Sequence, residues 1–178
     1  MNIHLRHWRP EDADSLVRLA NNKKIWDQLR DYFPFPYTHA HAQKWIGSHA
    51  GNKNSTHFVI TADHKLAGAI SLIPREDIYR CSAEIGYWVG EPYWGKGIAT
   101  AAVKQLLEFT EQRFPHIVRV YAEILASNKA SFRVLEKNGF YLESERKNSV
   151  IKNQVIGNDT VWVKQINLKN KTSDVRES

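Results

Sequence analysis

Cysteine and long apolar runs are scarce in this chain of 178 residues, and each scarcity excludes a class of protein. The single cysteine, Cys81, cannot form an internal disulfide, which is typical of proteins in a reducing compartment. No apolar run approaches the roughly 20 residues that cross a bilayer, and the first residues, MNIHLRHW, contain no signal-peptide core. The sequence therefore predicts a cytoplasmic protein with no membrane partner.

Dense basic runs and metal-ligand patterns are also missing. The formal net charge is +6, which favours anionic partners, but the lysines and arginines are scattered. The densest basic run, Arg146-Lys147, is too short for a nucleic-acid patch, so no direct nucleic-acid binding is expected. His39 and His41 are two positions apart in a predicted helix and would point in different directions. We therefore expect no metal.

The residues that are present predict one α/β domain, of the α+β type, over residues 1–168, followed by a polar tail at 169–178. A hydrophobic fraction of 42% and a charged fraction of 25% are ordinary for a globular protein. The early strands are expected to pair antiparallel, with a strand–helix–strand unit at the centre. Strands are predicted at 2–8, 58–62, 65–73, 81–89, 118–125, 140–146 and 160–168; helices are predicted after Pro10, near 24–29, at 39–49, from 98 to before Pro115, and from 128 to about 138.

The most informative stretch runs from Ala83 to Val103 and reads AEIGYWVGEPYWGKGIATAAV. An aromatic strand ends at Gly90, the chain passes through Gly95-Lys96-Gly97, and an amphipathic helix begins at Ile98. Strand, glycine turn and helix together present free backbone N–H groups and the positive end of a helix dipole. The stretch therefore predicts a site for a phosphate group.

This turn has three interpretations, and the first two lack residues that their motifs require. A nucleotide P-loop requires Ser or Thr after its lysine, whereas this chain has Gly97. A dinucleotide fingerprint, G-x-G-x-x-G, is absent. The turn could also be a helix entry that needs glycine for its backbone conformation alone.

Two spaced motifs carry a resemblance to a known family. Trp94-Gly95-Lys96-Gly97-Ile98-Ala99 resembles the coenzyme A pyrophosphate loop of the GNAT acetyltransferases, with Trp94 in place of the usual Gln or Arg. Asn128-Lys129-Ala130-Ser131 and the following VLEKNGF (134–140) resemble the second motif of the ribosomal-protein N-terminal acetyltransferases, the Rim group, in which PFPYT (34–38) is also common. The resemblance implies a single GNAT domain. Its mixed, mostly antiparallel sheet of six to seven strands would splay at the centre, between the strand ending at Val89 and the strand at Val118–Leu125, with helices on both faces.

The resemblance also implies acetyl-CoA as the co-substrate and direct transfer of the acetyl group to a primary amine. Backbone N–H groups of the glycine turn would hold the pyrophosphate, the backbone at Trp88 and Val89 would pair with the pantetheine arm, and the Val89 N–H would bind the thioester oxygen. The cofactor-binding residues implied in this way are Trp88, Val89, Trp94, Gly95, Lys96, Gly97, Ile98, Ala99, Thr100, Asn128 and Ser131.

The catalytic residues follow from the same motifs. The position at which many family members have a tyrosine acid holds Leu135, so Ser131 is the candidate to serve the leaving thiolate. Glu84, on the central strand, is the first candidate for a base that acts through water, and Glu143 is the weaker one. Tyr32 and Tyr37 are expected to line the acceptor pocket.

The acceptor is the open part of the prediction. An α-amino group has a pKa of about 7.7–8.0 and lysine about 10.4, a difference of about 3.4 kcal/mol at 1.36 kcal/mol per unit. A site without a certain base therefore favours the α-amine of a protein or peptide N-terminus. The alternatives are a small amine (a polyamine, amino sugar or drug) and a catalytically silent CoA-binding module. The chain is expected to be a monomer or a homodimer.

Overall fold

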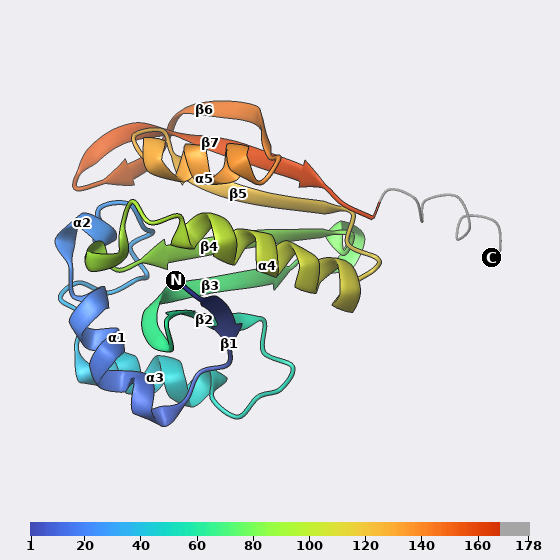
Figure 1. Ribbon diagram of the computed structural model, residues 1–178. Coiled ribbons are helices and arrows are strands. Elements are labelled where there is room, and N and C mark those ends of the chain that lie inside the picture. Colours follow the sequence, from blue (N-terminus) through green and yellow to red (C-terminus); the bar gives the residue numbers. More distant parts are fainter. Residues whose placement is uncertain (168–178) are drawn as a thin grey trace.

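A seven-stranded sheet forms the centre of the computed structural model, which describes residues 1–167 (Figure 1). The strand order is β1-β2-β3-β4-β5-β7-β6, and only the β4–β5 pair is parallel. This confirms the predicted mixed, mostly antiparallel sheet. The predicted tail from Lys169, and Leu168 at the end of the last strand, lie outside the described residues. The strands are β1 (Ile3–Arg6), β2 (His57–Ala62), β3 (Lys65–Pro74), β4 (Ser82–Val89), β5 (Arg119–Leu125), β6 (Tyr141–Lys152) and β7 (Val155–Gln165).

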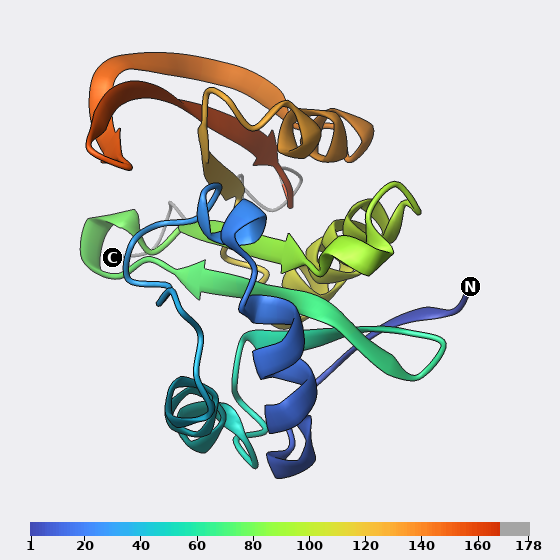
Figure 2. The ribbon, with the colours of Figure 1, turned by 90° about the vertical axis from the view of Figure 1, so that its left-hand side faces the viewer.

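Helices cover both faces of the sheet, as predicted (Figure 2). α1 (Ala13–Ala20), α3 (His39–His49) and the short α2 (Lys23–Trp26) precede β2, and α1 and α3 pack on one face. α4 (Ile98–Arg113) and α5 (Lys129–Lys137) pack on the other. Because side chains alternate along a strand, Phe58 and Ile60 enter the core under α4 while Val59 enters the core under α1 and α3.

Local signals in the sequence explain where several elements begin. Thr38 caps α3, since its hydroxyl accepts the backbone N–H of His41. Pro10 opens a 3₁₀ turn that leads into α1. The hairpin turn between β2 and β3 places Asp63 and His64 at φ values of 47° and 66°, the left-handed conformation that a two-residue turn requires.

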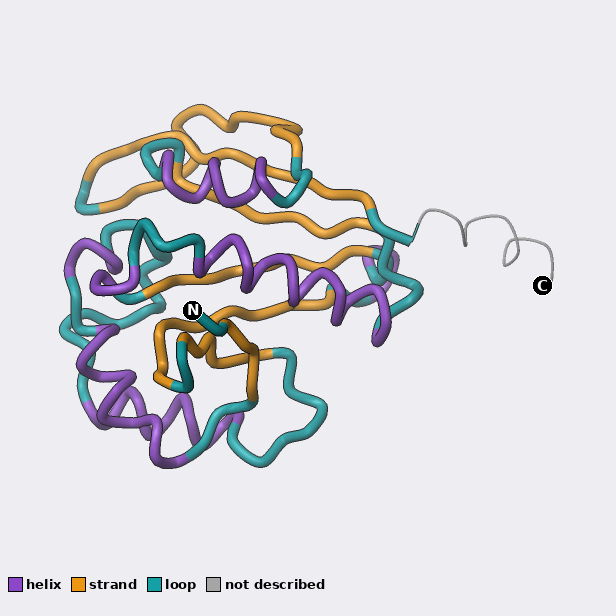
Figure 3. Tube along the Cα trace, viewed as in Figure 1, coloured by secondary structure: helices purple, strands orange, loops and turns teal. Residues whose placement is uncertain are grey.

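The final hairpin is much longer than predicted (Figure 3). The sequence places its strands at 140–146 and 160–168 and leaves 147–159 as a connection, whereas β6 and β7 continue to a turn at Asn153 and Gln154. The prediction was wrong because β6 is an exposed edge strand, so its side chains need not alternate between apolar and polar. Asn-Gln is also not one of the usual signals for a tight turn.

None of the helices within residues 1–167 combines the length and the apolar character that crossing a membrane requires.

Candidate functional site

The two central strands separate after a short stretch of pairing. β4 has eight residues and β5 has seven, but their parallel register covers only Ser82↔Arg119, Ala83↔Val120 and Glu84↔Tyr121. Beyond Glu84 the strands diverge, which confirms the predicted splay. The opening lies between β4 on one side and β5 with α5 on the other.

The backbone of β4 has one edge free at this opening. Gly90 N–H donates to Ala67 O at 2.8 Å and Arg75 N–H donates to Ser82 O at 2.9 Å, and the register between β3 and β4 has no shift. Because antiparallel pairs alternate, even-numbered residues of β4 bond to β3 and odd-numbered residues turn their N–H and C=O groups toward the opening. Val89 N–H therefore faces the opening, together with the backbone of Tyr87.

Trp88 needs a correction on the same grounds. Its backbone groups belong to the ladder with Ala69 of β3, so they are not free to pair with a pantetheine arm. Its indole instead lines the cavities on both sides of the opening. Trp94 acts on the strand as well, since its Nε1–H donates to Val89 O at 2.6 Å.

The glycine turn forms the entrance to α4. Gly95 and Gly97 both have φ of +73°, and a Cβ built on either would meet nothing within 4 Å. Glycine is therefore needed for its left-handed backbone and not to relieve crowding. Gly97 precedes a helix of 16 residues and no side chain caps its first N–H groups. These groups and the helix dipole favour an anion at this point.

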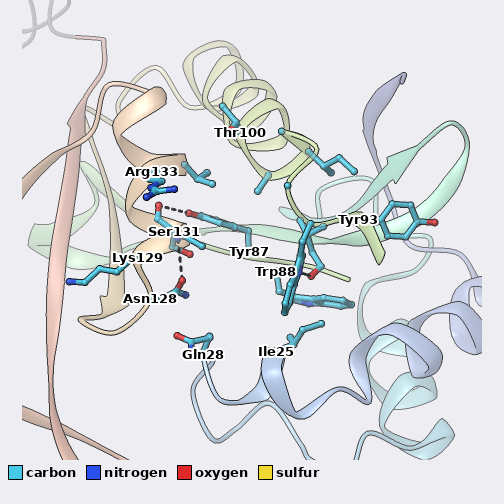
Figure 4. A pocket seen from close by; sticks show the side chains of 18 of the residues that line it. Ile25, Gln28, Tyr87, Trp88, Tyr93, Thr100, Asn128, Lys129, Ser131 and Arg133 are labelled. Carbon is cyan, nitrogen blue, oxygen red and sulfur yellow. Dashed lines mark hydrogen bonds between the residues drawn. The ribbon is translucent and has the colours of Figure 1, made fainter. Parts of the chain in front are cut away.

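A cavity of about 790 Å³ extends from this helix end into the opening (Figure 4). Residues 93–100 form one wall, and residues 127–131, 133 and 134 of the α5 segment form another. Lys96 also lines it, although its Nζ donates to Pro92 O at 2.9 Å. Basic side chains line the cavity and favour a phosphorylated carrier, although one of them, Lys24, pairs with Glu91. The cationic side chains of the cavity are Lys24, Lys96, Lys129, Arg133 and Lys137.

The start of α5 meets β4 beside this cavity. Asn128 caps the helix, because its Oδ1 accepts the Ser131 N–H at 3.1 Å. Tyr87 reaches across the opening and its hydroxyl donates to the Ser131 carbonyl oxygen at 3.3 Å (Figure 4). Burial raises the pKa of Tyr87 well above its usual range, so the phenol stays protonated. Leu135, by contrast, is fully buried in the core.

A second cavity, of about 720 Å³, lies beyond the opening on the side of α3. Tyr87 and Ser131 line both cavities and so mark the passage from one to the other. Sequence reasoning treated Tyr87 only as an apolar strand residue, because nothing local to the strand shows that it faces Ser131. The residues common to both cavities are Gln28, Leu29, Tyr87, Trp88, Asn128 and Ser131.

Glu84 lies in the second cavity, as predicted for a base, but its carboxylate is already paired. It is 9% exposed and accepts a hydrogen bond from the Arg30 guanidinium. Arg30 Nη2 also donates to Glu123 Oε2 at 2.9 Å, and Arg146 Nη1 donates to Glu123 Oε1 at 3.0 Å. Arg30 and Glu123 were not found from the sequence, because they lie 54 and 39 positions from Glu84. Glu143, the weaker candidate, pairs with Arg119 and lines neither cavity.

The predicted acceptor tyrosines both line the second cavity. Tyr32 is 76% exposed, whereas Tyr37 is 5% exposed and packs on Phe33 with ring centroids 5.1 Å apart. Burial raises the pKa of Tyr37 to about 12. Tyr32 can therefore reach a ligand freely, while Tyr37 belongs mainly to the wall.

One face of α3 forms the far end of the second cavity. Its residues were not predicted as site residues, because His41 was considered only as a metal ligand and no local pattern shows that this face lines a cavity. His57 of β2 lies against this face and bonds Ser71 Oγ through Nδ1 at 2.7 Å. Burial, followed by the nearby His49, lowers the pKa of His57 to about 4, so this imidazole is neutral at pH 7. The lining positions on the helix are His41, Lys44, Trp45, Ser48 and His49.

Within residues 1–167 no three His, Cys, Asp or Glu side chains are grouped so that they could hold a metal ion.

Comparisons with known proteins agree with this geometry. The family model for the acetyltransferase (GNAT) domain matches residues 2–141. Spermidine N(1)-acetyltransferase of Escherichia coli (strain K12) is 25% identical over 145 residues, 81% of this chain and 75% of that protein. Ribosomal-protein-serine acetyltransferase of the same strain is 34% identical over 86 residues, 48% of this chain and 47% of that protein. The crystal structure of the microcin C7 self immunity acetyltransferase MccE in complex with acetyl-CoA and AMP superimposes with a TM-score of 0.77, at 27% identity, over 92% of each chain.

Proposed function

The chain belongs to the GNAT acetyltransferase family, and on that premise we propose that this N-acetyltransferase carries an acetyl group from acetyl-CoA to the α-amino group of a peptide or protein N-terminus. The residues present fit the coenzyme. Uncapped N–H groups at α4 and five cationic side chains line the first cavity, and the odd-numbered backbone groups of β4 face the opening that a pantetheine arm would enter.

In the proposed reaction the neutral amine nitrogen attacks the thioester carbonyl, so that a C–N bond forms and the C–S bond breaks. The Val89 N–H is the proposed donor to the carbonyl oxygen as charge develops on it. The ammonium proton leaves to solvent or to a carboxylate of the second cavity, and the thiolate of CoA takes up a proton. We assign the hydrogen bond to that thiolate to the hydroxyl of Ser131, with Tyr87 beside it.

The observation that supports an α-amine most strongly is the pairing of both carboxylates in the second cavity. Glu84 and Glu123 are engaged by Arg30, and Lys44 adds a further positive charge. A polyamine keeps one or more positive charges besides the amine that reacts, and it would need unpaired carboxylates to hold them. An α-amine is also easier to deprotonate than the amines of a polyamine.

A second candidate acceptor is an amine attached to a nucleotide. The crystal structure of MccE is a complex with both acetyl-CoA and AMP. In this chain the second cavity continues past the carboxylates to aromatic rings and a lysine, which are more than an amine alone would require.

The test measures thiol release from acetyl-CoA with N-terminal peptides, spermidine and an aminoglycoside at equal concentration. We expect kcat/KM for the best peptide to exceed that for spermidine by about 10-fold or more, a difference of about 1.4 kcal/mol. A preference for spermidine of about 100-fold would reject the proposed acceptor. If the protein binds CoA but releases no thiol with any amine, it would instead be a catalytically silent CoA-binding module.

A further inference from the structure

The far end of the second cavity has a composition that the transfer reaction does not need. We call it the distal subsite and define it by His41, Lys44, Trp45, His49 and His57, all of which line the cavity. Lys44 is exposed and the other four side chains are partly exposed. The rings of this subsite are therefore not simply core residues, unlike Phe58, which lies beside His57 in the sequence and is 6% exposed.

The aromatic rings of the subsite form one continuous group. The centroids of Trp45 and His49 are 4.1 Å apart, those of His49 and His57 are 4.3 Å apart, and those of Trp45 and His57 are 5.3 Å apart. Phe33 and Tyr32, from the segment before α3, line the same cavity. Flat rings in a cavity favour a flat ring in the ligand, because stacking buries both faces.

The charge of the subsite selects against cations. Lys44 makes no salt bridge within residues 1–167, and the lining of the cavity contains no carboxylate besides Glu84 and Glu123, both of which pair with Arg30. Aromatic rings can also bind cations, but an unpaired ammonium group among them opposes that use. His49 Nδ1 lies 2.6 Å from Trp45 O and must donate to it, which fixes the ring and leaves Nε2 for a ligand.

We propose that the distal subsite binds the part of the acceptor that lies beyond the amine, and that this part is a flat aromatic ring with an anionic group beside it. Trp45 and His49 contact the ring, and Lys44 binds the anion. The inference rests on the proposed entry of the amine through the second cavity. Two sources supply this chemistry: a nucleoside monophosphate attached to the amine, or an aromatic and an acidic residue that follow a peptide N-terminus.

The test measures binding by calorimetry in the presence of saturating CoA, so that the coenzyme site is filled. The probes are AMP, adenosine, inorganic phosphate and the peptide Ala-Phe-Asp-amide, with Ala-Ala-Ala-amide as reference. The variants are Trp45→Ala, Trp45→Phe and Lys44→Ala, and the matched control is Gln43→Ala, an exposed residue of the same helix that does not line the cavity.

We expect AMP or Ala-Phe-Asp-amide to bind more tightly than inorganic phosphate or Ala-Ala-Ala-amide. Trp45→Ala should weaken this binding about 10-fold and Trp45→Phe less, since stacking on a nucleobase is worth about 1–3 kcal/mol and each 1.4 kcal/mol is tenfold. Lys44→Ala should weaken the binding of AMP about fivefold and leave the binding of adenosine unchanged. Tight binding of AMP would identify a nucleotide as the source of the ring and the anion. Tight binding of Ala-Phe-Asp-amide would identify a peptide as the source.

The proposal is overturned if no probe binds at millimolar concentration, or if the variants bind every probe as tightly as Gln43→Ala does. Because calorimetry needs no turnover, this failure is distinct from failure of the proposed function. If the enzyme acetylates peptides but binds no aromatic anion, the proposed function is supported and the distal subsite is rejected. If AMP binds but no amine is acetylated, the distal subsite is supported and the proposed function is rejected.

Discussion

The hydroxyl groups of Ser131 and Tyr87 lie at the passage between the two cavities, and single substitutions can distinguish their roles. Ser131→Ala removes the hydroxyl that we assign to the leaving thiolate, and we expect turnover to fall about 10-fold or more. Tyr87→Phe should lower turnover less, because its hydroxyl already donates to the Ser131 carbonyl oxygen. Single-turnover kinetics at saturating acetyl-CoA measure both. Unchanged turnover in Ser131→Ala would remove Ser131 from the mechanism.

His57 lines the second cavity, and its protonation makes the stability of the whole chain depend on pH. Its pKa is lowered to about 4 in the fold, against about 6.5 in an unfolded chain. The unfolded chain therefore binds more protons between these values, and stability is lost as the pH falls from about 6.5 toward 4. At pH 5 the loss is at most about 2 kcal/mol, reduced by partial exposure.

Urea unfolding at pH 7.5 and pH 5.0 checks this sign. His57→Gln should lose less free energy of unfolding between the two pH values than the parent does, whereas the control His4→Gln, an exposed position on β1, should behave like the parent. Equal losses in all three proteins would contradict the assignment. Carboxylates with a lowered pKa, such as Asp159, change the stability mainly at pH values below those compared here.

At the scale of an element, the entrance to α4 can be tested for charge and backbone conformation separately. Gly97 has φ of +73° with open space around its Cα, so both Asp and Asn fit sterically and tolerate this conformation better than other residues. Gly97→Asp should abolish measurable CoA binding, because it places a negative charge where the pyrophosphate is proposed to bind. Gly97→Asn should retain binding within about 10-fold. Calorimetric titration with CoA distinguishes the two, and equal affinities would place the pyrophosphate elsewhere.

The tip of the β6–β7 hairpin is a second element whose role can be measured. Lys152 Nζ bonds Asp31 Oδ1 at 2.6 Å and lies 3.4 Å from the centroid of the Trp26 ring. This contact holds the segment that carries Arg30 and Tyr32 into the second cavity. Lys152→Met should raise the KM for the acceptor about fivefold, for a contact worth about 1 kcal/mol, and leave CoA affinity unchanged. Lys147→Met, on the same strand, is the control, and a matching change there would count against this role.

Across the whole molecule, Arg30 joins the two halves of the splayed sheet. It pairs with Glu84, the last residue of β4 that pairs with β5, and with Glu123 of β5 just beyond the paired stretch. Arg30→Met leaves the buried Glu84 carboxylate without its partner, so unfolding free energy should fall by about 1–3 kcal/mol. Thermal unfolding should show a Tm lower by about 2–4 °C per kcal/mol, while Arg18→Met, at an exposed position of α1, should change the Tm little. A Tm unaffected by Arg30→Met would mean that the bridge adds nothing to stability.

The sequence by itself predicted the fold class from apolar alternation in the strands and a phosphate site from a glycine turn whose residues are neighbours in the chain. The splay and the coenzyme site were predicted from the resemblance of two motifs to the GNAT family; the structure confirms the splay, and the coenzyme site stays a proposal. It could not predict the length of the last hairpin, because an exposed edge strand is under no burial constraint that would mark it. The backbone role given to Trp88 failed for a similar reason, since hydrogen-bond direction depends on the register with β3.

The tertiary structure alone shows the contacts that form the second cavity. Tyr87 meets Ser131 across 44 positions, and Arg30 meets Glu123 across 93. The subsite on α3 forms only when β2 places His57 against that helix. No local pattern encodes such contacts, because they arise when distant segments bury their apolar faces together and bring their polar groups into one cavity. Only the glycine turn proposed to hold the pyrophosphate is therefore local in the chain, whereas both cavities are products of the packed fold.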